Sequence, residues 1–283
     1  MENLRKSKFL SKSDRDSELN GKVALITGGS SGIGFATACL FAQQGAKIAI
    51  LARNESRLSS ANEEIEISFG SGVSLPIICD VRNEKQVENA FNRVLDVYGS
   101  LDIVVSNAGY VSYAPFINTS LELWNDMMSI HSTAYFLVAR EAIRSFLKQN
   151  VQGAIVFIIS DNAIKPSKEM LAYNVAKASE LHMARCIADE CGNLGVRINS
   201  ILPGAVFGGS AFWTDDYREA RANVHGFKVE NLEEEYKKNT ALNVIIDPDE
   251  VAEIVLFLSS DRSKKVTGAV ISIDGGGRTG YVR

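Results

Sequence analysis

The sequence lacks any apolar run long enough to cross a membrane. A membrane-spanning helix needs about 20 consecutive apolar residues, whereas one of the longest runs here covers only residues 154–159. An excess of basic residues is also missing, since 30 Lys and Arg stand against 34 Asp and Glu, a formal net charge of −4. Binding to duplex DNA usually needs a cluster of basic residues. We therefore expect neither a membrane nor a nucleic acid as a partner.

Cysteine and histidine are scarce, with four Cys and three His among 283 residues. The cysteines form no CxxC pair and no spacing with His that is typical of metal sites, so no metal site is expected. Cys39 and Cys186 stand among apolar helical residues, which predicts buried structural thiols. Residues 1–20 are polar and contain no apolar core of a signal peptide. We therefore expect a cytoplasmic protein with a polar, partly disordered N-terminal arm.

Short apolar runs alternate along the chain with amphipathic helical stretches. The runs are bounded by Gly, Asn, Asp or Pro, and their nearly continuous hydrophobicity is typical of parallel strands covered on both faces. The predicted strands are 23–27, 47–51, 74–79, 101–106, 154–159, 196–201 and 269–273, and the predicted helices lie near 33–44, 54–69, 84–98, 120–149, 171–194 and 248–260. This alternation predicts a single α/β domain over 21–283, with a Rossmann-like, doubly wound parallel sheet of about seven strands.

One segment, 205–243, interrupts this alternation between the sixth predicted strand and the last helix. It contains Gly208, Gly209, Phe212 and Trp213, followed by charged helical stretches. Ligands of open α/β sheets bind beyond the carboxyl ends of the strands, so an insertion at this point would cover the ligand crevice. We interpret 205–243 as a substrate lid, and a surface helical hairpin is the alternative interpretation.

A glycine-rich turn, Gly28-Gly29-Ser30-Ser31-Gly32-Ile33-Gly34, lies between the first predicted strand and the first predicted helix. Glycine allows a tight turn and a close approach of the backbone, and the N-terminus of the following helix offers free N–H groups to a pyrophosphate. The position between strand and helix distinguishes a dinucleotide-binding turn from an ordinary glycine cluster. The turn therefore predicts a dinucleotide cofactor.

The pattern from Thr27 to Gly34 is TGxxxGxG, which resembles the cofactor turn of the short-chain dehydrogenase/reductase family. Further segments match that family in order over residues 20–277: Asp80-Val81 at the adenine ring, Asn107-Ala108-Gly109 after the fourth strand, Pro203-Gly204 after the sixth, and the C-terminal VTGAVISIDGGG. The resemblance implies a nicotinamide cofactor and a small-molecule substrate with a carbonyl or alcohol group. It implies that the cofactor is bound by Thr27, Gly28, Ser30, Ser31, Gly32, Ile33, Gly34, Asp80, Val81, Asn107, Ala108, Gly109, Tyr173, Lys177, Pro203, Gly204 and Val206.

The end of the second predicted strand bears on the choice between NAD and NADP. NAD enzymes usually carry there an acidic residue that binds the ribose 2′-hydroxyl, but this strand ends in Leu51-Ala52-Arg53-Asn54. Ala52 stands where the family has its NAD-selecting Asp, and Arg53 could pair with a 2′-phosphate. The family's other frequent phosphate partner, a basic residue in the glycine turn, is Ser31 here. These features favour NADP over NAD, and a solvated Arg53 is the alternative.

Tyr173 and Lys177 are four residues apart, so on a helix they share one face. Ser160 ends a predicted strand thirteen residues before Tyr173, and the three residues resemble the family's Ser–Tyr–Lys set. Hydride transfer to a carbonyl leaves an alkoxide that an acid must protonate. We expect Tyr173 to be this acid, with its pKa lowered by the Lys177 ammonium from its ordinary value of about 10. The resemblance implies that Lys177 also holds the nicotinamide ribose, and that Ser160 donates a hydrogen bond to the substrate oxygen.

Two positions depart from the family pattern. The family often adds an Asn seven residues after a Trp, but here Trp124 is followed at that spacing by His131. His131 could keep the role through its backbone carbonyl, join the proton relay, since imidazole has a pKa of about 6.5, or simply pack. Gly208 replaces the Thr or Ser that the family usually has after the Pro-Gly motif, and Ser210 could supply the missing contact.

The leading interpretation is an NAD(P)-dependent dehydrogenase or reductase. The segment around 210–243 is similar to the dehydrogenase part of rhamnulose-phosphate aldolase/alcohol dehydrogenases, which implies a sugar- or polyol-like substrate. Two alternatives remain: reduction of a 3-oxoacyl thioester on an acyl carrier protein, and a regulator that binds the dinucleotide without turnover. The family resemblance also implies a homo-oligomer, a tetramer or a dimer.

Overall fold

The computed structural model describes residues 17–209 and 212–277. Most of the predicted N-terminal arm, and Ser210, lie outside these residues. The last four residues of the arm are described and pack on the domain: Leu19 is buried, and the Glu18 N–H donates to the side chain of Gln44. The end of the arm is therefore in contact with the domain that follows it.

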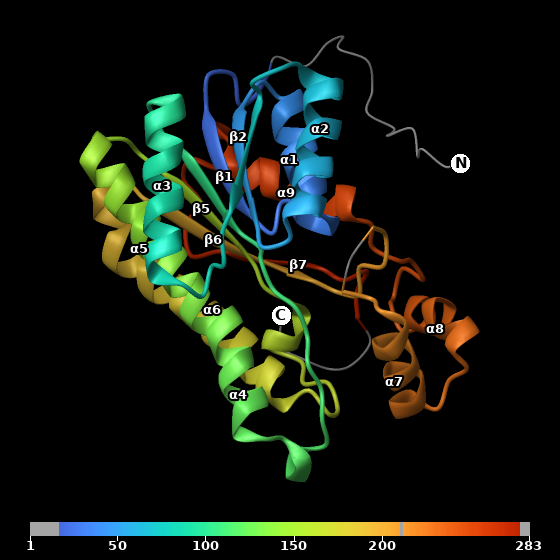
Figure 1. Cartoon of the computed structure of the whole chain (residues 1–283). Helices are drawn as coiled ribbons and strands as arrows, with labels where there is room; N and C mark the ends of the chain where they lie inside the picture. Colours follow the sequence, from blue (N-terminus) through green and yellow to red (C-terminus); the bar gives the residue numbers. More distant parts are fainter. Residues whose placement is uncertain (1–16, 210–211, 278–283) are drawn as a thin grey trace.

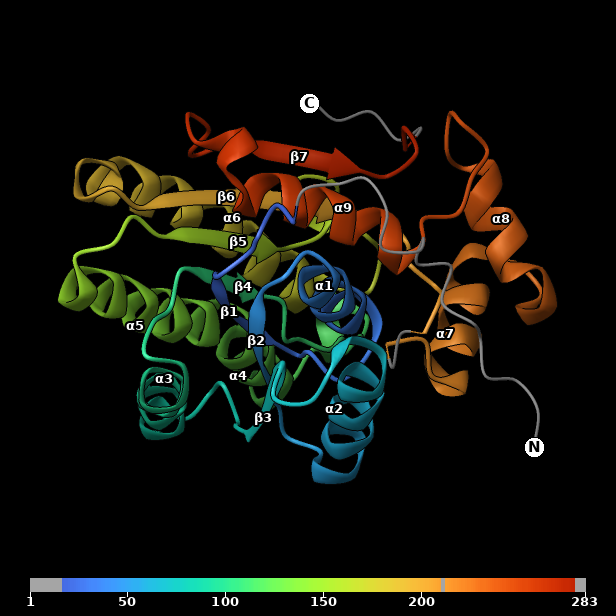
Figure 2. The same ribbon diagram turned by 90° about the horizontal axis from the view of Figure 1, so that it is seen from above.

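Seven parallel strands form one sheet in the order β3-β2-β1-β4-β5-β6-β7 (Figures 1 and 2). The strands are β1 Val23–Thr27, β2 Lys47–Ala52, β3 Ser74–Ile78, β4 Ile103–Ser106, β5 Ala154–Ile158, β6 Arg197–Pro203 and β7 Val270–Ile273. The seven predicted strands are confirmed, with ends that differ by no more than two residues. The strand order reverses between β1 and β4, which is where doubly wound sheets bind their ligands.

Helices cover both faces of the sheet (Figure 2). One face carries α1 Gly32–Gln43, α2 Glu55–Phe69 and α9 Pro248–Ser259, and the other carries α3 Glu84–Tyr98, α4 Leu121–Met127, α5 Ala134–Gln149 and α6 Leu171–Cys191. Alternate residues of a central strand enter two different apolar clusters: Leu25 packs on one side and Ile26 on the other. This two-sided burial explains the nearly continuous hydrophobicity of the central strands. The edge strands β3 and β7 are only partly covered, so the expectation of coverage on both faces is wrong for them.

The predicted helix over 120–149 consists of three parts. A π-helical turn, Met128–Thr133, joins α4 to α5 and contains His131. A single π turn inside a helix is frequent at functional sites, because it changes the direction in which side chains point. Here it lies beside the carboxyl ends of the central strands.

The segment after β6 forms α7 Asp215–His225 and α8 Leu232–Lys238. Both helices lie beyond the end of the sheet where β6 and β7 finish (Figures 1 and 2). Thr214 caps α7 by accepting a hydrogen bond from the Tyr217 N–H. The segment therefore lies at the end of the sheet where the sequence placed the ligand crevice.

All four cysteines are free. Cys39 is buried as predicted, but the prediction of a buried Cys186 is wrong, because Cys186 is exposed. The buried face of α6 runs through Lys177, Leu181 and Ala184, and position 186 falls on the opposite side of the helix. None of the described helices is long and apolar enough to span a bilayer.

Candidate active site

A cavity of about 930 Å³ opens at the carboxyl ends of the strands. Its walls come from the glycine turn, the end of β2, the loops after β4, β5 and β6, helix α6 and the segment 205–243. It brings together these sequence-predicted residues: Gly28, Ser30, Ser31, Gly32, Ile33, Arg53, Asn107, Ala108, Gly109, His131, Ser160, Tyr173, Lys177, Pro203, Gly204 and Val206. The other four, Thr27, Gly34, Asp80 and Val81, do not line it.

Thr27 and Gly34 shape the glycine turn from behind. Thr27 Oγ1 accepts hydrogen bonds from the backbone N–H groups of Asn107 (2.9 Å) and Ala108 (3.0 Å), which ties the turn to the loop after β4. A Cβ on Gly34 would collide with the Gly28 carbonyl oxygen. Ser31, at the N-cap of α1, makes no capping hydrogen bond with its side chain. The turn thus presents close-packed backbone and a helix N-terminus, which suit a pyrophosphate.

Two guanidinium groups line the cavity at the end of β2, those of Arg53 and Arg57. Arg53 lies 5.3 Å from the ring centre of Tyr110, and its Nη1 is 3.9 Å from Asp80 Oδ2. Arg57 was missed by the sequence analysis. Arg57 could have been predicted from its place in the first turn of α2. Asn54 caps this helix by accepting a hydrogen bond from the Arg57 N–H at 2.8 Å.

Asp80 is engaged mainly by a neighbouring arginine. Arg82 Nη2 lies 2.7 Å from Asp80 Oδ2, and Arg82 Nε also donates to this carboxylate. These hydrogen bonds lower the pKa of Asp80 below its ordinary value. Asp80 therefore stays ionised, and its charge is balanced by Arg82 and Arg53.

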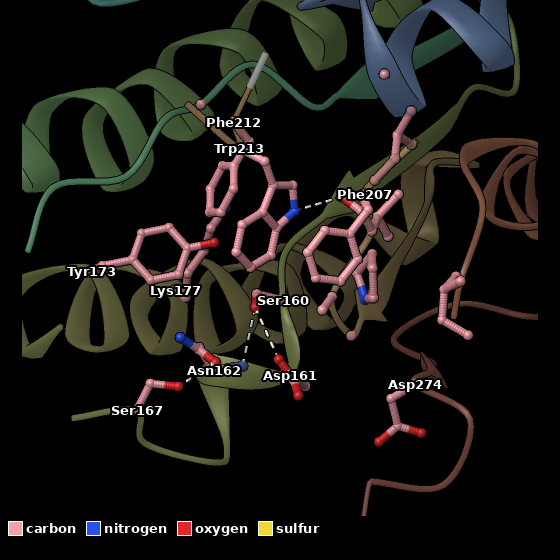
Figure 3. A pocket seen from close by; sticks show the side chains of 18 of the residues that line it. Ser160, Asp161, Asn162, Ser167, Tyr173, Lys177, Phe207, Phe212, Trp213 and Asp274 are labelled. Atoms are coloured by element: carbon pink, nitrogen blue, oxygen red, sulfur yellow. Dashed lines mark hydrogen bonds between the residues drawn. The ribbon is translucent and has the colours of Figure 1, made fainter. Parts of the chain in front are cut away.

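Ser160 and Tyr173 lie together in the cavity (Figure 3). Ser160 Oγ accepts from the Asn162 N–H at 3.1 Å and donates to Asp161 Oδ1 at 3.2 Å. Burial raises the pKa of Tyr173 well above 10, nearby Tyr217 and Glu180 raise it further, and a hydrogen bond with Ser160 opposes these effects. The phenol is therefore protonated at neutral pH.

The expected net lowering of the Tyr173 pKa is wrong for this structure, because burial raises this pKa well above 10 despite the nearby Lys177. The Lys177 Nζ lies 5.6 Å from the Tyr173 ring centre, and it binds both oxygens of Glu180, at 3.1 and 3.0 Å. Burial is the largest influence on both groups: it raises the pKa of Tyr173 and lowers that of Lys177. The buried partner of Lys177, Glu180, was not recognisable from the sequence.

His131 is buried and makes contacts on both ring nitrogens. Nε2 is 2.7 Å from the carbonyl oxygen of Tyr110, and Nδ1 is 3.1 Å from Glu180 Oε1. The ring also meets the Tyr173 ring edge to face, with 5.1 Å between centres. Burial and the Lys177 charge lower the pKa of His131, while Glu180 opposes this effect. Glu180 was missed by the sequence analysis, although it stands three residues after Lys177 on the same helix.

A polar wall lies beside Ser160. Ser167 Oγ donates to Asn162 Oδ1 at 3.2 Å, Asn162 Nδ2 donates to Asn174 Oδ1 at 3.1 Å, and Asn174 Nδ2 donates to the Ser167 carbonyl at 2.9 Å. Asn162 and Ser167 line the cavity. None of these residues was predicted, because the motif that locates Ser160 says nothing about the loop after it.

An aromatic wall faces the polar one across Ser160 (Figure 3). Phe207 and Trp213 are stacked with 4.2 Å between ring centres, and Trp213 Nε1 donates to the Val206 carbonyl at 2.8 Å. Phe212 approaches Tyr173, with 6.4 Å between ring centres. The predicted lid therefore contributes large apolar surface directly beside the candidate acid.

The predicted lid also contacts the glycine turn. The N–H of Gly32, the first residue of α1, donates to the carbonyl of Gly209 at 3.1 Å. Gly208 packs against Pro248, since a Cβ on Gly208 would lie 3.2 Å from Pro248 Cδ. Gly208, which stands where the family usually has Thr or Ser, is therefore close to the start of α9.

The sequence profile of the family described as enoyl-(acyl carrier protein) reductase matches residues 28–278. The uncharacterized oxidoreductase YuxG of Bacillus subtilis is 43% identical over 95% of this chain, which spans only 39% of that longer protein. The 3-oxoacyl-[acyl-carrier-protein] reductase FabG of Chlamydia muridarum is 33% identical over 92% of this chain and 99% of its own length. The crystal structure of L-sorbose reductase from Gluconobacter frateurii, complexed with NADPH and L-sorbose, has a TM-score of 0.83 at 29% identity, covering 94% of this chain and 100% of its own.

Proposed function

This chain belongs to the short-chain dehydrogenase/reductase family, and we propose that it transfers hydride between NADP and the carbonyl or secondary-alcohol group of a small sugar- or polyol-like molecule. The observation that carries the substrate class is the pair of unlike walls around Ser160. Asn162 and Ser167 bond to each other and would redirect hydrogen bonds to substrate hydroxyl groups, while Phe212 and Trp213 offer flat apolar faces. A polyhydroxylated carbon chain presents both kinds of surface. The similarity to L-sorbose reductase supports this proposal.

The residues around the glycine turn and the end of β2 fit a nicotinamide dinucleotide. The close-packed turn and the N-terminus of α1 would hold the pyrophosphate. Arg53 and Arg57 would pair with a 2′-phosphate, because guanidinium groups match phosphate geometry and no carboxylate ends β2. When bound, the nicotinamide supplies or accepts the hydride. The sorbose reductase was solved with NADPH, which supports the preference for NADP.

In the reducing direction, Tyr173 would act as the proton donor. Its raised pKa keeps the phenol protonated at neutral pH, so the O–H is available when negative charge develops on the substrate oxygen. Ser160 would donate a second hydrogen bond to that oxygen, giving up its present bond to Asp161. Proton transfer leaves a Tyr173 phenolate, which the nearby Lys177 ammonium would stabilise. In the oxidising direction, the same phenolate would accept the alcohol proton.

Phe212 and Trp213 would exclude water from this reaction. Both line the cavity, and Phe212 approaches the ring of Tyr173. Excluding water strengthens the electrostatic interactions of Ser160, Tyr173 and Lys177. This is the role that we propose for the lid 205–243.

Reduction of a 3-oxoacyl thioester is the second candidate, and the similarity to FabG favours it. The polar wall argues against it, because a saturated acyl chain cannot use the hydrogen bonds of Asn162 and Ser167. A dinucleotide-binding regulator is disfavoured by the placement of Ser160, Tyr173 and Lys177 on one cavity.

We also propose a cytoplasmic homo-oligomer. Exposed apolar side chains occur on two neighbouring helices of one face, Phe136 and Leu147 on α5 and Leu171 and Val175 on α6. A second copy of this chain would cover them. Light scattering after size-exclusion chromatography should give a mass above that of one chain, and Phe136→Glu should reduce it. A wild-type mass equal to one chain would refute this proposal.

The test of the proposed function combines binding with turnover. Fluorescence titration should show tighter binding of NADPH than of NADH. With NADPH, a panel of keto-sugars and 3-oxoacyl thioesters should identify a keto-sugar as the better substrate, and Tyr173→Phe should abolish turnover while leaving NADPH binding intact. Turnover of the thioesters alone would refute the sugar proposal. NADPH binding with no turnover of any compound would contradict the proposal that this chain is an enzyme.

A further inference from the structure

Glu180 is a fully buried carboxylate that the proposed chemistry leaves unexplained. Its side chain is 0% exposed, it binds Lys177 Nζ with both oxygens, and Oε1 also contacts His131 Nδ1. The charged and titratable groups around the contact are Lys177 and Tyr173 on α6 and Tyr135 on α5, with the Tyr110 carbonyl at the far side of the imidazole. A buried charge is retained only when its neighbours compensate it.

Counting hydrogens shows what state this cluster holds. The Tyr110 carbonyl can only accept, so Nε2 of His131, 2.7 Å away, must carry a hydrogen. A neutral ring then has a lone pair on Nδ1, and an ionised Glu180 has only lone pairs on Oε1. Two acceptors 3.1 Å apart do not attract each other, so a proton must lie between Nδ1 and Oε1. The His131–Glu180 pair then holds one shared proton, whether it is carried on the ring or on the carboxyl group.

This proton has a consequence for Lys177. With it, the His131–Glu180 pair is electrically neutral as a unit, and the ammonium of Lys177 is the net positive charge beside Tyr173. Without the shared proton, the negative charge of Glu180 would neutralise the Lys177 ammonium. The same negative charge would also disfavour a Tyr173 phenolate. We propose that His131 and Glu180 are positioning residues whose shared proton preserves the influence of Lys177 on Tyr173. This proposal rests on the proposed function only for its effect on rate.

The first test does not need turnover. The chain has three histidines, so ¹⁵N-histidine NMR can follow His131, assigned by its loss in His131→Asn. We expect a hydrogen on Nε2 and a hydrogen-bonded Nδ1 throughout pH 6 to 8. A ring with its single hydrogen on Nδ1, or with an unbonded Nδ1, would overturn the proposal even if no substrate were found.

The second test uses turnover and two substitutions of Glu180. A Gln side chain can donate to Nδ1 and accept from Lys177, so it imitates the neutral pair; we expect Glu180→Gln to keep kcat for alcohol oxidation within about threefold at pH 7. Glu180→Leu removes both contacts and should lower kcat by about 100-fold. Above the pH at which the wild-type pair loses its proton, wild-type kcat should fall, whereas kcat of Glu180→Gln should not.

Glu141→Gln is the matched control, because Glu141 is a buried glutamate on α5 that pairs with Arg140 and Arg144 and does not line the cavity. It should leave the pH profile unchanged. Equal losses in Glu180→Gln and Glu180→Leu would show that the carboxylate charge itself is required, which contradicts a neutral pair. If Glu180→Leu does not fold, the Gln profile and the NMR spectrum still decide.

A separate observation concerns the end of the cavity formed by α7. Arg221 lines the cavity and is only 2% exposed, yet it pairs with no carboxylate in the described part of the chain. Its guanidinium donates to the Lys168 carbonyl at 2.9 Å and to the Tyr236 hydroxyl at 3.5 Å, and its Nη2 lies 2.6 Å from His225 Nε2. Burial and the charges of Arg221, Lys168 and Lys165 lower the pKa of His225, so its ring is neutral and accepts from Arg221. The site therefore holds a buried positive charge with only neutral partners.

We infer that this end of the cavity binds an anionic group, a carboxylate or a phosphate, on the substrate. The planar guanidinium matches both groups, and a bound anion would supply the charge compensation that the protein side chains do not provide. This inference rests on the proposed function and narrows its substrate to a sugar acid or a sugar phosphate.

Thermal unfolding tests this inference without turnover. We expect inorganic phosphate or gluconate to raise the Tm of the wild type and of Arg218→Gln, but not of Arg221→Gln. Arg218 is the control because it lies on the same helix, pairs with Glu233 and does not line the cavity. The probe that gives the larger shift distinguishes phosphate from carboxylate. An equal shift in Arg221→Gln, or kcat/KM values for neutral keto-sugars that match those for anionic ones, would overturn the inference while leaving the proposed function intact.

Discussion

The backbone of Gly109 lies so close to the ring of His131 that a Cβ at position 109 would be 2.6 Å from His131 Cε1. Cβ atoms do not approach other atoms this closely without a shift of the neighbour. The absence of a side chain at 109 therefore allows the imidazole to reach the Tyr110 carbonyl and Glu180 together.

Gly109→Ala should displace His131 and lower kcat by about tenfold, because the shared proton would lose its fixed geometry. His131 NMR signals should shift in the same variant. Gly192→Ala is the control, since a Cβ at 192 meets no atom within 4 Å and its backbone is helical. An unchanged His131 signal in Gly109→Ala would contradict this explanation of the glycine.

The pH dependence should differ between the two reaction directions. Burial raises the pKa of Tyr173, so at neutral pH the protonated form needed for reduction dominates and the phenolate needed for oxidation is scarce. Carbonyl reduction should therefore be nearly independent of pH between 6 and 8, whereas kcat/KM for alcohol oxidation should rise about tenfold per pH unit. Stopped-flow measurement of the hydride step in both directions would check this. A reduction rate that falls steeply from pH 6 to pH 8 would show that the Tyr173 pKa is not raised.

The two arginines at the end of β2 should determine the cofactor preference. Arg53→Ala and Arg57→Ala should each weaken NADPH binding about tenfold and change NADH binding little, because only NADPH has a 2′-phosphate. Calorimetric titration would measure both constants. Arg93→Ala, at an exposed position on α3 away from the cavity, is the control. Equal weakening of NADPH and NADH binding in Arg53→Ala would instead indicate that the stacking of Arg53 on Tyr110 matters, and not a contact with the 2′-phosphate.

The cysteines should react with a thiol reagent in an order set by burial. Burial raises the pKa of Cys39 and of Cys79 to about 12, so both stay as thiols at pH 8, while Cys186 is exposed. Alkylation of the native protein followed by mass spectrometry should find Cys186 modified well before Cys39 and Cys79. Early modification of Cys39 would show that α1 opens readily.

The motifs and the period of the apolar residues were enough to predict the strands, most helices and the residues that meet at the cavity. Burial was not predictable in the same way. Glu180 stands in the sequence as an ordinary polar residue of a long helix, and only the packing of α6 against the π-helical turn shows that it is enclosed with His131. The same packing makes burial the largest influence on the pKa of Tyr173, which reasoning from Lys177 alone put in the wrong direction. The polar wall of Asn162 and Ser167 depends on how a loop folds back, and no periodic pattern describes such a loop.

The π-helical turn Met128–Thr133 takes up one residue more than a regular helical turn and joins α4 to α5 without breaking the helix. Because the extra residue is absorbed within the turn, Tyr135 and Phe146 stay buried on α5 while His131 reaches the Tyr110 carbonyl. Deleting one residue between 128 and 133 should therefore leave the buried face of α5 in place and move His131 away from the Tyr110 carbonyl and Glu180. The site can thus be changed at this turn without altering the core that α5 covers.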